Sequence, residues 1–199
     1  MSFTFEEIAD AERTIPPSET MESYIRSYPE LVRFFLDLNT ISIHEFIIGA
    51  HAVYGWMPTI LTLNEPSTGF QAVVDILNGV KYGQQLDSYS LLTLKSAINN
   101  SLVGTSKLLH FIRPDKYAIW DSRVYRFWSK STPHHHRLQD PYAYISYLNN
   151  CVQISNTVGF DSLLNRVNTK MGYTDYRVTA LRAIEWVAYM ADRQRVFTA

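Results

Sequence analysis

Residues 101–128, SLVGTSKLLHFIRPDKYAIWDSRVYRFW, contain two helical patterns separated by one proline. At 100° per residue, the apolar side chains of the first pattern fall on one face of a helix. These side chains are Leu108, Leu109, Phe111 and Ile112. Lys107, His110 and Arg113 fall on the opposite face, and Pro114 ends the helix. We therefore expect a helix whose polar side presents a lysine, a histidine and an arginine.

The second pattern follows Asp121, a residue type that is preferred at helix N-caps. The positions that face inward are Val124, Phe127 and Trp128. Arg123, Arg126 and Lys130 share the outer stripe of the same helix. Because three cations at this spacing suit a run of phosphates, we expect these side chains to bind a DNA backbone.

The segment before Lys107 carries the glycine of this region, Gly104. We expect a glycine-bearing turn here, with backbone N–H groups at Val103, Gly104 and Thr105 directed toward DNA. A turn that leads into a helix N-terminus is a ready anion site.

Helix signals recur through the rest of the chain. Capping or first-turn residues stand at Pro29, Ser42, Ser67, Asp87, Pro141 and Asp161, and a last apolar stripe begins near Thr174. The chain has 8 glycines and 8 prolines, too few turn signals for a β-sandwich or a β-barrel. The sequence therefore predicts an all-α fold with nine or ten helices, without an internal repeat.

Charge is distributed unevenly along the 199 residues. The first 100 residues carry 12 acidic and 5 basic side chains, whereas the remainder carries 7 acidic and 13 basic ones. The basic excess is concentrated in residues 101–137, which indicates a surface that attracts a polyanion. The overall pI of 6.6 argues against a protein that coats nucleic acid without discrimination.

Other features limit the cellular context. The single cysteine, Cys151, excludes an internal disulfide and reads as a core residue. The acidic N-terminus lacks the basic-then-apolar order of a signal peptide, and no apolar run is long enough to cross a bilayer. His134, His135 and His136 are consecutive and cannot all converge on one ion, so we expect a surface loop and no metal. We expect a cytoplasmic monomer without a cofactor or a membrane partner.

The glycine-bearing segment, the lysine helix and the Ile-Trp-Asp before the next helix resemble the helix-hairpin-helix superfamily of DNA glycosylases. The 8-oxoguanine type is the most similar, with Lys107-Leu-Leu-His-Phe-Ile and Ala-Ile-Trp-Asp-Ser-Arg-Val following its lysine helix and aspartate turn. By this resemblance, Lys107 is the nucleophile that attacks the sugar C1′ carbon, and Asp121 stabilises the developing positive charge. The resemblance covers about residues 101–128. One glycine instead of two, a lysine-to-aspartate spacing of 14 and Ser122-Arg123 after the aspartate indicate a divergent branch.

The acidic first half and the basic second half, together with a central hairpin that must face a duplex, predict two helical lobes with a central helix-hairpin-helix element. We expect a central lobe over about residues 42–130, which contains the hairpin and the active site. The N-terminal helices (1–41) and the C-terminal helices (139–199) are expected to form the second lobe. Tyr54, Trp56, His110 and Trp120 are candidates for the pocket that holds the flipped modified nucleotide, since extruded bases stack on aromatic side chains. Taken individually, Tyr54, Trp56 and Trp120 are more often core residues than pocket residues.

The leading hypothesis is therefore a DNA glycosylase that excises an altered base, with or without AP-lyase activity. The base is an oxidised purine in a repair role or a hypermodified viral base in an anti-phage role. An alternative is a non-catalytic helical module that binds nucleic acid or a protein through the basic face of residues 101–137. A third reading is a nucleoside or nucleotide hydrolase that uses Asp121 without the lysine.

Overall fold

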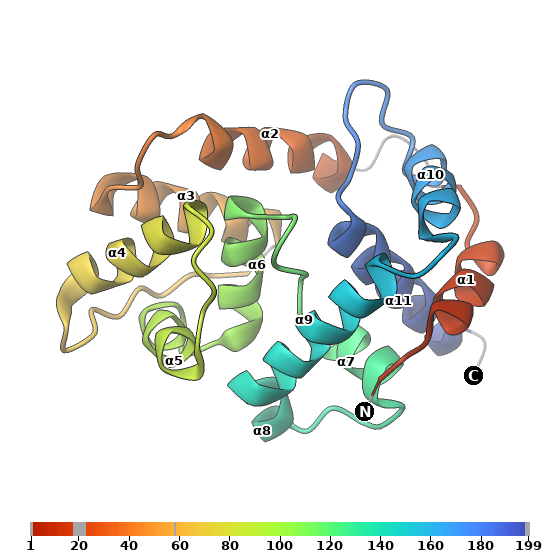
Figure 1. Ribbon diagram of the computed structural model, residues 1–199. Coiled ribbons are helices and arrows are strands. Elements are labelled where there is room, and N and C mark those ends of the chain that lie inside the picture. Colours follow the sequence, from red (N-terminus) through yellow and green to blue (C-terminus); the bar gives the residue numbers. More distant parts are fainter. Residues whose placement is uncertain (1, 18–22, 58, 198–199) are drawn as a thin grey trace. The chain divides into compact units, whose positions relative to one another are not determined.

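The computed structural model describes residues 2–17, 23–57 and 59–197. Over these ranges the chain forms eleven helices and no β-strand, apart from one isolated bridge between Leu63 and Ile98 (Figure 1). The helices are α1 Phe5–Thr14, α2 Ser23–Asp37, α3 Ile43–Trp56, α4 Gly69–Lys81, α5 Ser88–Ala97, α6 Leu102–Ile112, α7 Ser122–Ser129, α8 His135–Leu138, α9 Pro141–Ser155, α10 Phe160–Met171 and α11 Ala180–Phe197. The all-α prediction is confirmed, although these ranges contain one helix more than the nine or ten that we expected.

Several helices begin at the capping residues that the sequence indicates. Ser42 and Glu45 form a reciprocal capping box at the start of α3. Asp87 accepts a hydrogen bond from the backbone N–H of Ser90 and so caps α5. These side chains satisfy N–H groups that have no partner within the helix, which fixes where each helix starts.

Three of the predicted helix starts are wrong. Pro29 does not open a helix, because it lies inside α2, which the structure describes from Ser23 onward. The N-cap of α4 is Thr68 rather than Ser67, and its side chain makes no capping hydrogen bond. The N-cap of α10 is Gly159 at φ 92°, so Asp161 lies inside the first turn instead of capping it. A left-handed glycine supplies the sharp change of direction between α9 and α10, which an aspartate N-cap does not provide.

The chain divides into two compact units. The central unit comprises residues 23–114, and the terminal unit combines residues 1–22 with residues 115–199. These boundaries differ from the predicted lobes, because α2 belongs to the central unit and α7 to the terminal unit. Lys107 and Asp121 consequently lie in different units.

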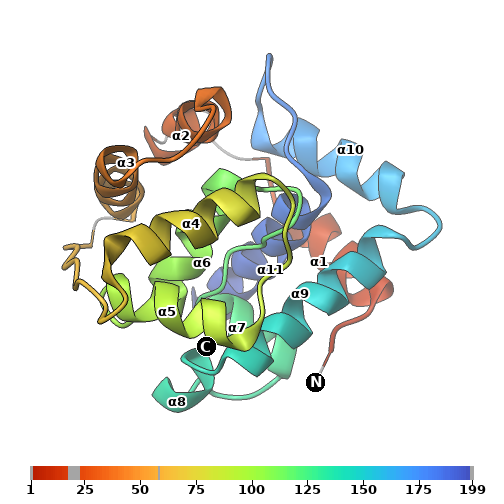
Figure 2. The same ribbon diagram turned by 60° about the vertical axis from the view of Figure 1, so that its left-hand side comes forward.

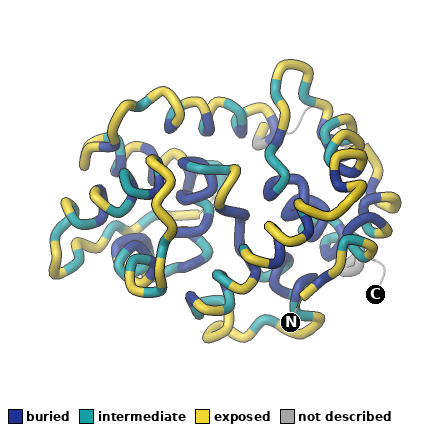
Figure 3. The backbone as a smooth tube through the Cα atoms, viewed as in Figure 1, coloured by how far each residue is buried: buried dark blue, intermediate teal, exposed yellow. Residues whose placement is uncertain are grey.

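Helix α6 is the centre of the central unit. It contacts α2, α3, α4 and α5, and Figure 2 shows α4 and α5 beside it. All of its residues are buried except Val103 and Lys107, which are partly exposed. Figure 3, in the orientation of Figure 1, shows the tube coloured by burial, with buried residues in dark blue. A helix that is surrounded on nearly every side is expected to be apolar all round, as most of α6 is.

Helix α11 has the corresponding role in the terminal unit. It packs against α1, α7, α9 and α10, and residues 181–188 are all buried. An aromatic cluster lies beside it, in which the ring of Trp120 contacts Tyr125, Trp128, Tyr144 and Tyr147. Cys151 is fully buried in α9, as predicted, and burial raises the pKa of its thiol. Among the described residues, no helix is both long and apolar enough to span a bilayer.

Candidate functional site

Lys107 is the sixth residue of α6, more than one turn inside the helix. Its neighbours Ser106 and Leu108 are buried, and its own side chain is partly exposed. Lysine is rarely fully buried, and a partly buried lysine on a core helix holds its ammonium group at the edge of an apolar interior. The helix thus presents one titratable amine at the surface of the central unit's core.

The turn that precedes α6 lies earlier in the chain than we predicted. It spans residues 98–101, where Asn99 and Asn100 adopt left-handed φ values of 51° and 48°. Ser101 is the N-cap of α6, so Val103, Gly104 and Thr105 form the first turn of the helix rather than a hairpin. Asparagine tolerates the left-handed region better than most residues, so two asparagines serve where a glycine was expected.

The predicted use of this segment as a phosphate cradle is therefore wrong for two of its three residues. The N–H of Gly104 donates to Oγ of Ser101 at 3.2 Å, and the N–H of Thr105 donates to the carbonyl of Ser101 at 3.0 Å. Both residues are buried, whereas Val103 is partly exposed. Backbone N–H groups that already have partners inside the protein do not bind an external phosphate.

Gly104 instead allows α3 and α6 to approach closely. A Cβ atom at this position would lie 2.7 Å from Cζ of Tyr54. The buried Tyr54 side chain hydrogen-bonds Ser101, and burial raises the pKa of its hydroxyl to about 12 despite this bond. Tyr54 is thus a packing residue of the central unit, and the prediction that it lines a substrate pocket is not supported.

His110 is fully buried, contrary to the predicted polar face. Its Nε2 lies 2.7 Å from the hydroxyl of Tyr28, and the two groups are hydrogen-bonded. The rings of Tyr28 and Trp56 both contact Phe111. Trp56 is partly exposed and lies at the margin of this aromatic cluster. The helical wheel failed here because α2 and α3 cover the face that an isolated helix would expose.

Arg113 makes a contact that the sequence did not indicate. Its Nη1 donates to the carbonyl of Lys81 at 3.0 Å, at the C-terminal end of α4. Lys81 in turn donates to the carbonyl of Phe35 at 2.7 Å, near the end of α2. Two cations therefore satisfy carbonyls at helix C-termini, where positive charge is favourable.

Asp121 is the N-cap of α7 in the terminal unit. The backbone N–H groups of Arg123 and Val124 both donate to its Oδ1, each at 2.9 Å. Neither of these two bonds uses Oδ2, and the residue is partly exposed. The capping prediction is confirmed, and the carboxylate has a fixed orientation at the positive end of the helix.

The predicted cation stripe of α7 is paired with carboxylates of the same unit. Arg126 makes a two-pronged contact with Asp192 of α11, at 3.0 Å from Nε and 2.6 Å from Nη2. Arg123 lies 3.6 Å from the same carboxylate, and its guanidinium stacks over the ring of Tyr189. Lys130 pairs with Glu7 at 3.0 Å. The prediction that these three cations bind phosphates stays a prediction, and each of them has an acidic partner that α11 or α1 supplies.

Trp120 does not line a pocket of the terminal unit. It is fully buried, and its indole N–H donates to the carbonyl of Leu138 at 3.1 Å. The segment just before it is also core, since the hydroxyl of Tyr144 donates to the carbonyl of Ala118 at 3.1 Å. The sequence Ala-Ile-Trp-Asp therefore consists of three buried residues, 118–120, followed by Asp121, the N-cap of α7.

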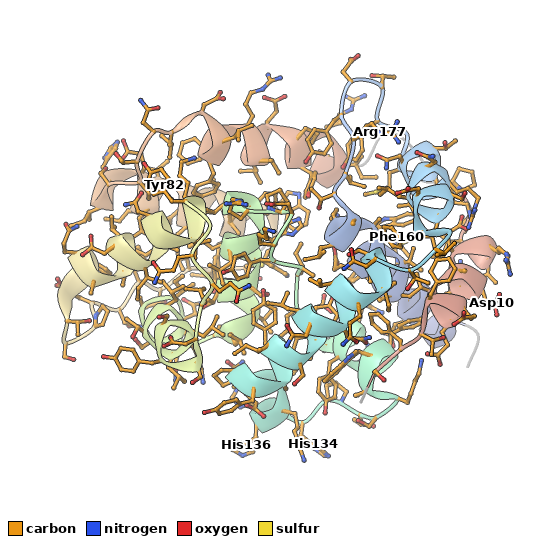
Figure 4. The ribbon with its side chains drawn as sticks, in the orientation of Figure 1. Asp10, Tyr82, His134, His136, Phe160 and Arg177 are labelled. Atoms are coloured by element: carbon orange, nitrogen blue, oxygen red, sulfur yellow. The ribbon has the colours of Figure 1, made fainter. Side chains whose placement is uncertain are left out.

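The histidine run is exposed, as predicted, although it includes a short helix rather than only a loop. His134 precedes α8, and Figure 4 shows His134 and His136 directed away from the protein. The residues that the structure describes contain no group of three histidine, cysteine or acidic side chains that could hold a metal ion.

One groove was not anticipated from the sequence. It has a volume of about 550 Å³ and lies between α1, α7 and α11. Glu7, Asp10 and Lys130 line it together with Phe127 and Gln194. The groove was hard to predict from the sequence, because its lining residues come from three segments that are more than 60 residues apart from one another.

Comparison of this chain with known protein families, with curated proteins and with solved structures gives no match.

Proposed function

We propose that this protein is a DNA glycosylase that excises an altered base, with Lys107 as the nucleophile and Asp121 as the group that stabilises charge on the sugar. The observation that carries the proposal is the partly exposed Lys107 on a helix of which every other residue except Val103 is buried. A solvated surface lysine would be expected on an outer helix face with other polar residues around it.

Two further observations support the proposal. Helices α5 and α6 pack against each other and are joined by a tight turn, as the resemblance to helix-hairpin-helix glycosylases requires. Asp121 begins the next helix in the chain, and its Oδ1 alone makes both capping bonds. A carboxylate fixed in this way is suited to electrostatic stabilisation of a cation, since it needs little reorganisation.

The reaction would proceed by displacement at C1′ of the damaged nucleotide. The neutral amine of Lys107 forms a bond to C1′ while the N-glycosidic bond breaks, and the base leaves with the bonding electrons and takes up a proton. The amine loses a proton, and opening of the sugar ring gives a Schiff base between Lys107 and the strand. Asp121 stabilises the positive character that the sugar develops during bond breaking.

The non-catalytic alternative has less support. It needs a basic face over residues 101–137, but Arg113, Arg126 and Lys130 all have partners within their own units. A hydrolase of free nucleosides that used Asp121 alone would leave the position of Lys107 unexplained.

Borohydride trapping tests the proposal directly. The protein is incubated with duplex oligonucleotides that carry a panel of oxidised and hypermodified bases, with and without borohydride, and strands are then cleaved by alkali. We expect a covalent protein–DNA complex with at least one substrate, and Lys107→Ala should abolish it. Lys116→Ala is the matched control, because Lys116 is an exposed lysine outside the proposed machinery.

Three outcomes are informative. Release of base that persists in Lys107→Ala and disappears in Asp121→Asn would assign the attack to water rather than to Lys107. Full activity in both variants would show that Lys107 and Asp121 are not the catalytic residues. Absence of base release from every substrate in the panel would contradict the proposed function.

A further inference from the structure

Helix α3 of the central unit is apolar on nearly every side, yet one of its sides is open to solvent. Among its 14 residues, Glu45 is the only aspartate, glutamate, lysine or arginine. The helix packs against α2, α4 and α6, and Figure 2 shows α2 and α4 beside it. A helix that is apolar all round is ordinarily enclosed by its neighbours. The open side of α3 is therefore unusual for a helix of this composition.

The exposed residues on this side form one stripe along the helix. At 100° per residue they fall within an arc of about 100°. They are His44, Ile48, His51, Ala52 and Gly55, and Ile48 is 47% exposed. A single exposed apolar residue indicates nothing, but a stripe without aspartate, glutamate, lysine or arginine has the composition of the core of a protein–protein interface.

Gly55 is a second and independent observation. Other glycines inside the helices of this unit face a neighbour that leaves no room for a side chain. A Cβ atom at Gly49 would lie 2.5 Å from Cζ of Phe35, and one at Gly79 would collide with Oε1 of Gln84. A Cβ atom at Gly55 would meet no described part of the protein within 4 Å outside its own helix. Glycine inside a helix costs stability relative to alanine, and no contact within the unit explains this cost.

The stripe is complementary to a copy of itself. Ile48 and Gly55 are seven residues apart, so the protruding side chain and the bare backbone lie about 10 Å apart on one face. In an antiparallel pair with its two-fold axis between residues 51 and 52, Ile48 of each copy faces the partner's Gly55. The same contact then occurs twice, as an isologous interface requires. Small residues at such a contact allow two helix axes to approach to about 8 Å.

Charge and size also favour a second copy. A stripe without net charge does not repel its own copy, and it offers a nucleic acid no lysine or arginine for its phosphates. Helix α3 is about 21 Å long, so its open face covers well under the roughly 800 Å² per partner of a standard stable interface. We therefore expect weak association, with a Kd on the order of 10–100 µM.

We propose that the open face of α3 binds α3 of a second copy of this chain, in an antiparallel two-fold pair in which Ile48 of each copy fills the space beside the partner's Gly55. The dimer does not depend on the proposed glycosylase function. It differs from the monomer that we expected from the sequence.

Sedimentation equilibrium of the full chain tests the proposal, at protein concentrations from about 1 µM to about 500 µM, which bracket the expected Kd. We expect the parent protein to dimerise over this range. Ile48→Arg places like charges at both contacts and should weaken the association at least about tenfold. Leu92→Arg is the matched control, because Leu92 on α5 of the same unit is also 47% exposed. It should dimerise as the parent does.

Gly55 provides a readout that a purely structural role would not give. Gly55→Ala should raise the melting temperature at low protein concentration, where the monomer predominates, because alanine is the better helix former. The same substitution should weaken dimerisation, and Gly55→Leu should abolish it. A variant that is stabilised as a monomer but loses association is expected only if a second copy occupies this space.

Cross-linking tests the position of the two-fold axis. Ala52→Cys should form an intermolecular disulfide under mild oxidation, since residue 52 lies beside the proposed axis. Leu92→Cys should not, and the fully buried Cys151 should leave the parent protein without a cross-link. This test needs no disruptive substitution, and circular dichroism verifies that every variant is folded.

Three results would overturn the proposal. The first is a parent protein that stays monomeric over the whole concentration range. The second is dimerisation that persists in folded Ile48→Arg and Gly55→Leu variants, which would place the contact on another surface. The third is a monomeric parent whose binding to a DNA duplex is weakened by Ile48→Arg, which would assign this face to nucleic acid.

Discussion

Gly104 and Tyr54 show how a single pair of residues sets the distance between two helices. Any side chain at position 104 would enter the space of the Tyr54 ring, since an added Cβ would lie 2.7 Å from Cζ and 3.0 Å from Cε2. In an exposed helix, replacement of glycine by alanine would stabilise the protein by up to about 1 kcal/mol. At this position the clash must outweigh that gain.

We predict that Gly104→Ala destabilises the protein by about 2 kcal/mol, a typical cost of overpacking in a core. Thermal or urea unfolding measures this change. Tyr54→Phe removes the hydroxyl that is nearest to the new methyl group, so the double variant should lose less stability than the sum of the two single variants. Additive effects would show that the ring of Tyr54 moves freely away from α6.

Asp121 offers a second residue-scale prediction, which separates capping from chemistry. Asparagine caps helices about as well as aspartate, so Asp121→Asn should change the free energy of unfolding by less than about 0.5 kcal/mol. Asp121→Ala should cost about 1 kcal/mol through loss of the cap. If the proposed function holds, both variants should lose base excision by about a hundredfold. Full base excision by the Asp121→Asn variant would show that Asp121 only caps α7.

The residue types at the candidate site were predictable, but their surroundings were not. The cap at Asp121 follows from local rules, and the sequence alone identified it. The burial of His110 and the pairing of Arg126 with Asp192 depend on α2 and α11, which lie far away in the sequence. A helical wheel has no information about which distant element covers which face.

At the scale of elements, Glu12 links α1 to α10. Its carboxylate is buried and contacts Nε of Arg166 and Nζ of Lys170, each at 2.7 Å. Burial alone would raise the pKa of Glu12, but the hydrogen bonds and charges of Lys170 and Arg166 outweigh it, and the pKa lies below its usual value of 4.5. A buried carboxylate with two cationic partners is stabilising only while it is ionised.

Stability should therefore depend on pH in the acidic range. Because the pKa of Glu12 is lower in the folded state, its contribution is present above the unfolded-state pKa of about 4.5 and is lost as the pH falls through the folded-state value. We predict that Glu12→Gln costs about 2 kcal/mol at pH 7 and that this difference shrinks as the pH falls below the unfolded-state pKa of about 4.5. Thermal unfolding at a series of pH values measures it, and a cost independent of pH would contradict the prediction.

The positions of the helices were easier to predict from the sequence than the contacts between them. Helices with strong caps, such as α3 and α5, begin where Ser42 and Asp87 indicate. The turn before α6 was misplaced because glycine was taken as the turn residue, whereas Asn99 and Asn100 adopt the left-handed conformation. Intrinsic turn preferences for asparagine are weaker than those for glycine, and only the partner segment at residues 60–64 makes the choice clear.

At the scale of the molecule, the N-terminal segment is part of the terminal unit's core. Phe3, Ile8 and Ile15 are each at most 2% exposed, and Asn150 of α9 hydrogen-bonds both the N–H and the carbonyl of Phe3. Burial of three large apolar side chains contributes about 6 kcal/mol. That amount is comparable with the total stability of a typical domain.

We predict that deletion of residues 1–17 unfolds the terminal unit, whereas the helical signal of residues 23–114 largely persists. Circular dichroism and limited proteolysis, with fragments identified by mass, measure the outcome. Phe3→Ala in the full chain should cost about 3 kcal/mol and leave the protein folded, which distinguishes lost packing from a general effect of truncation. A truncated protein that unfolds like the parent would contradict the assignment of α1 to this core.

Assembly of one unit from both ends of the chain has a consequence for synthesis on the ribosome. Helix α11 begins at Ala180, and α1 ends at Thr14, so 166 residues of translation separate the two partners. At about 5–20 residues per second, α1 waits on the order of 10–30 s for the helix that covers it. Its apolar face, with Ile8, is not covered by α11 during this interval. The contiguous central unit, by contrast, can fold while the ribosome is still adding residues 115–199.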